Sequence, residues 1–120
     1  MATTFSIGRI LCGALVLAIG LAAPAVAQAQ DAALVKKGEA LYAAQKCNIC
    51  HSIAGKGKAT GPLDGVGKKL TAEQIREWFT HPVEAAAKAK STKKPPMPAK
   101  YAKLPAADID ALVAYMQSLK

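Results

Sequence analysis

Two cysteines and a histidine lie within one short segment, Cys47-Asn48-Ile49-Cys50-His51. On a helical turn, side chains three positions apart project from the same face, so the two thiols point the same way. The His51 imidazole follows directly and adds a metal-ligating nitrogen to this turn. The segment therefore places three reactive side chains at one small site, and the rest of the chain must fold around the group that they bind.

Four kinds of site compete for this segment. A disulfide between Cys47 and Cys50 would leave His51 unused, and so short a loop gives limited entropic stabilisation. A thioredoxin-like redox pair needs a strand before the motif, and no alternating β-branched run occurs in the chain. A zinc site needs four ligands, whereas the only other histidine is His81. The spacing C-x-x-C-H is instead typical of c-type haem attachment, with both cysteines as thioethers and the histidine on the iron.

Residues 1–29 have the pattern of a secretory signal peptide. Arg9 precedes an apolar run from Ile10 to Ala23, and Pro24 and a stretch of small residues follow. Cleavage after Ala27 or Ala29 satisfies the rule for small residues equally well. An uncleaved membrane anchor is the competing interpretation, because the apolar run is just long enough to span a bilayer. We expect export to the periplasm, with residues 30–120 as the mature domain.

The composition of the mature part indicates one small domain that needs extra apolar bulk. Only 5% of the 120 residues are aromatic, and a bound cofactor would supply the missing core. The whole chain has 16 Lys and Arg against 8 Asp and Glu, a net charge of +8. Losing Arg9 with the signal leaves +7, so the working domain itself is basic and favours acidic partners. Its basic segments lack the interleaved aromatics of a single-strand nucleic-acid platform.

From about Asp31 to Lys120 the chain resembles a small bacterial class I c-type cytochrome, monohaem and exported. The resemblance implies an all-α, cytochrome c-like fold with three main helices and loops wrapped around one covalent haem. We expect the first helix to begin at Asp31 as N-cap and to cross the closing helix at Gly38 and Tyr42. The closing helix is predicted from about Ala106 to Leu119, after a proline that is tolerated at a helix start.

The resemblance also includes two further segments of the chain, which are expected to lie next to the haem. In Gly61-Pro62-Leu63, the family pattern implies that the Pro62 carbonyl accepts the N–H of the proximal ligand His51. A short helix opened by a capping box of Thr71 and Gln74 should end at Pro82. This helix carries Trp78, whose indole N–H would contact a haem propionate, although ordinary core packing is the alternative.

The second axial ligand is predicted to be Met97, in the segment Lys94-Pro95-Pro96-Met97-Pro98. A thioether is a soft ligand that suits haem iron and raises its reduction potential relative to a second imidazole. The neighbouring prolines restrict the backbone and lower the entropy lost when the loop is held over the iron. His81 is the competing ligand, and Met116 is expected in the core of the closing helix.

With both axial positions filled, the iron has no open site, so we expect a one-electron carrier and not an enzyme. The alternative is the haem c subunit of a periplasmic dehydrogenase or oxidoreductase complex, and a third reading is a sensor or peroxidase in which Met97 dissociates. A free carrier is expected to be a monomer in a respiratory electron-transport chain. Acidic redox partners should dock on lysines that flank Met97. These are Lys88, Lys90, Lys93, Lys94, Lys100 and Lys103.

Overall fold

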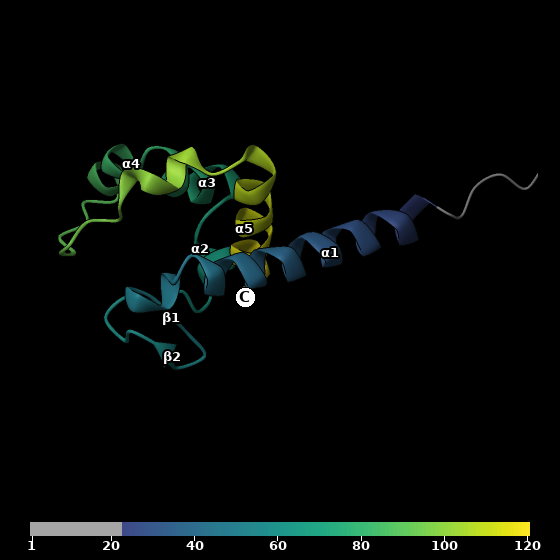
Figure 1. Cartoon of the computed structure of the whole chain (residues 1–120), viewed down its shortest axis with the longest axis horizontal. Helices are drawn as coiled ribbons and strands as arrows, with labels where there is room; N and C mark the ends of the chain where they lie inside the picture. The colour runs from purple at the N-terminus through teal and green to yellow at the C-terminus, as the bar shows by residue number, and fades with distance from the viewer. Residues whose placement is uncertain (1–22) are drawn as a thin grey trace, which may run out of the picture.

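The computed structural model describes residues 23–120 (Figure 1). Most of the predicted export signal, residues 1–22, lies outside this range, so the signal and its cleavage remain predictions. The first helix, α1, spans Ala23–Ala44 and passes through both predicted cleavage positions. None of the described helices combines the length and the apolar composition needed to cross a membrane.

The start of α1 differs from the sequence-based expectation. The prediction that Asp31 caps this helix is wrong, because Asp31 lies within α1. Alanine and glutamine fill most of the stretch before Asp31, and both are good helix formers, so the helix continues upstream. At its other end α1 stops at Ala44, and Lys46 adopts the left-handed conformation with φ 55°. This turn leads the chain straight into Cys47.

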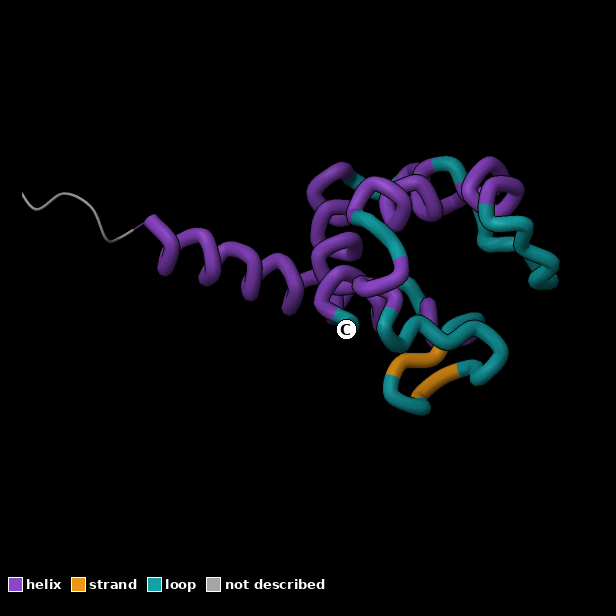
Figure 2. The backbone as a smooth tube through the Cα atoms, turned by 180° about the vertical axis from the view of Figure 1, so that it is seen from behind, coloured by secondary structure: helices purple, strands orange, loops and turns teal. Residues whose placement is uncertain are grey.

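Short elements connect α1 to the closing helix (Figures 1 and 2). In chain order they are η1 (Cys47–Ile49), β1 (Ser52–Ile53), β2 (Lys56–Gly57), α2 (Val66–Lys69), α3 (Ala72–Thr80), α4 (Pro82–Lys88) and η2 (Ala99–Lys103), and α5 (Ala106–Ser118) closes the chain. The two strands form one antiparallel hairpin in which Ser52 lies opposite Gly57. Helices therefore make up nearly all regular structure of the described residues, which confirms the predicted all-α class.

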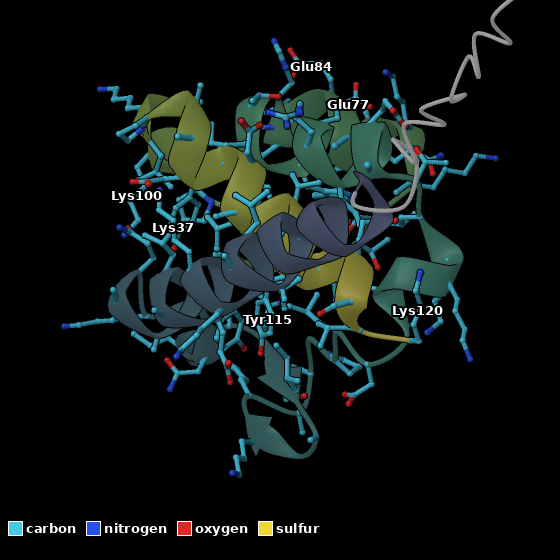
Figure 3. The ribbon with its side chains drawn as sticks, turned by 90° about the vertical axis from the view of Figure 1, so that its right-hand side faces the viewer. Lys37, Glu77, Glu84, Lys100, Tyr115 and Lys120 are labelled. Carbon is cyan, nitrogen blue, oxygen red and sulfur yellow. The ribbon has the colours of Figure 1, made fainter. Side chains whose placement is uncertain are left out.

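The helices α1 and α5 pack across one another (Figure 1). At the crossing Gly38 is buried, and a Cβ atom built on it would lie 2.0 Å from the Ala111 carbonyl oxygen. Tyr42, one turn later, meets Tyr115 of α5 edge-on, with 5.9 Å between ring centroids. Tyr115 is labelled in Figure 3. These contacts confirm the expectation that Gly38 and Tyr42 meet the closing helix. Position 38 requires glycine, because a side chain there would prevent this close approach of the two backbones.

The helix α3 begins as predicted. The Thr71 side chain accepts the Gln74 N–H, and the Gln74 side chain accepts the Thr71 N–H, which completes the capping box. Pro82 follows the end of α3, but the same proline occupies the first turn of α4, a helix that the sequence did not predict. The chain therefore turns at His81 and continues as a second short helix.

One hydrophobic core joins α1, α3 and α5, the three helices expected from the sequence. Its members are Tyr42, Ile75, Phe79, Ile109, Leu112, Val113 and Met116. Partly buried residues from the intervening segments pack against them, including Cys47 and Met97. The core thus borders directly on two of the residues with predicted haem roles, Cys47 and Met97.

Candidate cofactor site

A cavity of about 1490 Å³ opens beside the core. One wall is formed by the end of α1, η1 and residues 58–66, and another by α3, α4 and residues 91–101. Leu112 and Met116 of α5 also line it. This volume exceeds the roughly 300–1,000 Å³ of an ordinary small-molecule pocket, so the cavity can accept a large ligand.

The two cysteines lie on the first wall and on one turn. The N–H groups of Cys50 and His51 both donate to the Cys47 carbonyl, at 3.1 and 2.9 Å. Cys47 is half buried, Cys50 is exposed, and both thiols are free. Burial raises the pKa of the Cys47 thiol, whereas a backbone hydrogen bond and the charge of Lys100 act in the opposite direction. Two free thiols on a cavity wall are what covalent attachment to a bound macrocycle requires.

The His51 ring is held by one backbone contact. Its Nδ1 lies 3.1 Å from the Gly61 carbonyl oxygen. Because a carbonyl only accepts, Nδ1 carries the proton and donates, and the lone pair remains on Nε2. This is the arrangement in which an imidazole binds a metal through one nitrogen while the other is oriented by its surroundings.

The acceptor differs from the prediction by one residue. We expected the Pro62 carbonyl, but the contact is made by Gly61, whose carbonyl belongs to the Gly61–Pro62 amide. The reason is a strand-like pairing, in which the Ser52 N–H donates to Gly61 and the Leu63 N–H donates to Ser52. This pairing turns the Gly61 carbonyl towards His51. A Cβ atom on Gly61 would lie 2.2 Å from the Cys50 carbonyl oxygen, so glycine is required here.

The backbone of His51 is held as firmly as its ring, by contacts that the sequence did not predict. The Tyr42 hydroxyl donates to the His51 carbonyl at 3.2 Å, and the Lys58 N–H donates to the same oxygen at 3.1 Å. Gly57, with φ 107°, packs on this carbonyl so closely that a Cβ atom would lie 2.2 Å from its oxygen. The spacing of the glycines in residues 55–61 is the sequence signal for such close backbone packing, but it does not show that the His51 carbonyl is the group they pack against.

Met97 is half buried and lines the cavity together with three flanking prolines, Pro95, Pro96 and Pro98. Met116 also reaches the cavity, but it is 4% exposed and belongs to the core, as predicted. His81 is exposed between α3 and α4, outside the cavity lining, and its Nδ1 lies 2.9 Å from the Thr80 hydroxyl. Among the candidates for a second axial ligand, the cavity therefore favours Met97 over His81.

The remaining lining fits a porphyrin. Trp78 is half buried on the α3 side of the cavity, where its predicted propionate contact stays a prediction. Ile49 and Val83 are 63% and 71% exposed, and both line the cavity, so a bound macrocycle would cover apolar surface on η1 and α4. The apolar walls carry two thiols that can attach to a porphyrin, and an oriented imidazole and a thioether that can bind its iron. These are the groups that hold a c-type haem.

Comparison with known proteins supports this assignment. A protein-family model described as Cytochrome c matches residues 35–120, most of the chain. Comparisons with curated proteins and with solved structures found no match. The family match implies covalently bound haem c with its iron and a role in electron transfer. With this match and an all-α fold around a haem-sized cavity, the chain belongs to the cytochrome c family.

Proposed function

We propose that this cytochrome is a periplasmic one-electron carrier whose haem is attached through Cys47 and Cys50 and ligated by His51 and Met97. The observation that carries the proposal is the shared cavity, which is lined by all four of these residues from two separate parts of the chain. Haem c, when bound, supplies an iron that alternates between its ferrous and ferric states.

The protein contributes by positioning the side chains that would bind the iron and by excluding exchangeable ligands from it. The Gly61 carbonyl keeps the His51 proton on Nδ1, so Nε2 is ready to donate its lone pair to a metal. The Met97 thioether is a soft ligand and favours the reduced state more than a second imidazole would. If His51 and Met97 both bind the iron, no position would remain for an exchangeable substrate, which supports electron transfer as the activity.

Docking of acidic redox partners is proposed at the rim of the cavity. Its exposed lysines come from both walls, and they are Lys46, Lys58, Lys93, Lys94 and Lys100. Lys90 and Lys103 are also exposed, whereas Lys88 forms an ion pair with Glu77 and contributes less free charge than the sequence suggests. Such a rim steers an anionic partner towards the cavity and raises the encounter rate.

A mass measurement tests the attachment. In cells that attach haem to c-type cytochromes, the unfolded wild-type protein should retain the mass of one haem. The double variant Cys47→Ala/Cys50→Ala should retain none, while Met97→Ala should keep the haem because it leaves both thioethers intact. Haem that dissociates from the unfolded wild-type protein would contradict the proposal.

Cell fractionation tests the proposed periplasmic location. Purification from the native cells tests whether the carrier is free. Consistent co-purification with a catalytic polypeptide would support the alternative role as a subunit of an oxidoreductase complex.

Charge-matched variants test the docking rim. Ferrocyanide, an anionic one-electron donor, should reduce the ferric protein more slowly as ionic strength rises. Lys93→Gln/Lys94→Gln should weaken this salt dependence. Lys68→Gln/Lys69→Gln removes the same charge from two residues at the end of α2 that do not line the cavity, and should change the salt dependence less. Equal effects of the two pairs would mean that net charge, and not the rim, governs the encounter.

A further inference from the structure

Tyr101 connects the Met97 segment to the haem-attachment segment. It lies in η2, four residues after Met97, and its half-buried ring lines the cavity and packs on the core. Its hydroxyl lies 3.5 Å from the carbonyl oxygen of Gln45, longer than the roughly 2.5–3.0 Å of an ordinary O–H···O hydrogen bond, so the contact is a weak one. Gln45 follows the end of α1 and precedes Cys47 by two positions, so this contact joins the two walls of the cavity.

The end of α1 is a suitable place for such a contact. Carbonyl groups at a helix C-terminus lack intrahelical donors, and they attract hydroxyl groups and cations. The neighbouring residue Lys100 lines the same cavity as Gln45, and its charge opposes the rise in the pKa of the Cys47 thiol. The Lys100 ammonium also lies 5.1 Å from the centroid of the Tyr101 ring. Burial raises the pKa of Tyr101, so the phenol keeps its proton and remains a donor.

We propose that Tyr101 is a positioning residue for Met97, and that its hydroxyl, by holding the Met97 segment against Gln45, limits how often the thioether leaves the iron. The proposal rests on the His51–Met97 ligation proposed above. Pro98 is the N-cap of η2, so Met97 is joined directly to the segment that carries Tyr101, and a movement of this segment away from the first wall breaks the Tyr101–Gln45 contact. A contact of this length should contribute about 0.5 kcal/mol, the lower end of the usual range for one hydrogen bond. Its loss would raise the population of the open state about twofold.

Imidazole is the probe, because it can bind the ferric iron at the distal side only when Met97 has left. The apparent affinity of the ferric protein for imidazole is therefore proportional to the open population. Tyr101→Phe keeps the ring and removes only the hydroxyl, so it should bind imidazole about twofold more tightly than wild type. Tyr115→Phe is the matched control, since Tyr115 lies outside the cavity lining and should leave the affinity unchanged.

The thermal midpoint of each variant is measured in parallel. A tyrosine with a merely structural role would lower the midpoint without changing the imidazole affinity, and that result would overturn the proposal. Equal increases in affinity for Tyr101→Phe and Tyr115→Phe would overturn it as well. Failure of the underlying ligation is recognised separately: the far-red charge-transfer band of methionine-ligated ferric haem would then be missing from the wild-type protein before any imidazole is added.

Discussion

Replacing Gly38 with alanine tests the crossing of α1 and α5. The new methyl group would lie 2.0 Å from the Ala111 carbonyl oxygen and 2.6 Å from the Tyr115 Cβ atom. Both are fixed close to the backbone of α5, so the helices must separate. Alanine gains about 1 kcal/mol in helix propensity over glycine, whereas overpacking costs about 1–3 kcal/mol and more where backbone is displaced. We expect a net loss of about 2 kcal/mol, because rigid atoms place the cost at the upper end.

Thermal unfolding of the haem-loaded protein measures this loss. About 2 kcal/mol corresponds to a fall in Tm of roughly 8–16 °C for a domain of this size. Lys36→Ala, at an exposed position of the same helix, is the control and should change the stability by less than about 0.5 kcal/mol. A Gly38→Ala variant that is more stable than wild type, by the helix-propensity gain alone, would refute the close crossing.

Three other substitutions have defined outcomes. Thr71→Ala removes the cap oxygen that accepts the Gln74 N–H at 3.2 Å, and should lower the unfolding free energy in guanidinium titrations by about 1 kcal/mol. Lys90→Gly should raise the unfolding free energy by about 1 kcal/mol, because Lys90 has φ 50° in the turn that ends α4. An unchanged unfolding midpoint would contradict this expectation. Gly61→Ala should displace the carbonyl that accepts the proximal imidazole proton, since its methyl group would lie 2.2 Å from the Cys50 oxygen. The imidazole becomes less basic, so voltammetry should show a higher reduction potential; an unchanged potential with haem attached would speak against that contact.

Much of the fold follows from local signals in the sequence. The capping box at Thr71, the helical period of the closing helix and the mid-helix glycine at Gly38 each reflect interactions of neighbouring or crossing segments, and the structure contains all three. The C-x-x-C-H motif and Met97, which were recognised by their residue types and their order in the chain, also line the cavity. These features are readable because each depends on a residue type at a fixed spacing.

One feature was misread although its signal is local. The extension of α1 upstream of Asp31 follows the helix propensity of the residues before it, so a cap at Asp31 was the wrong interpretation. Other features depend on tertiary context. The choice of Gly61 over Pro62 as the acceptor is decided by pairing with Ser52, which lies in a different segment. The contacts of Tyr42 with His51 and of Tyr101 with Gln45 join residues whose proximity appears only in three dimensions. No local pattern specifies such partners.

The visible spectrum of the ferric protein tests the proposed axial ligation most directly. Wild-type protein should show the far-red charge-transfer band that marks a methionine–iron bond in this family, and Met97→Ala should lose it. Met116→Leu should keep the band, because Met116 is the other methionine that lines the cavity and is assigned to the core. Absence of the band from the wild-type protein, or its survival in Met97→Ala, would contradict ligation by His51 and Met97.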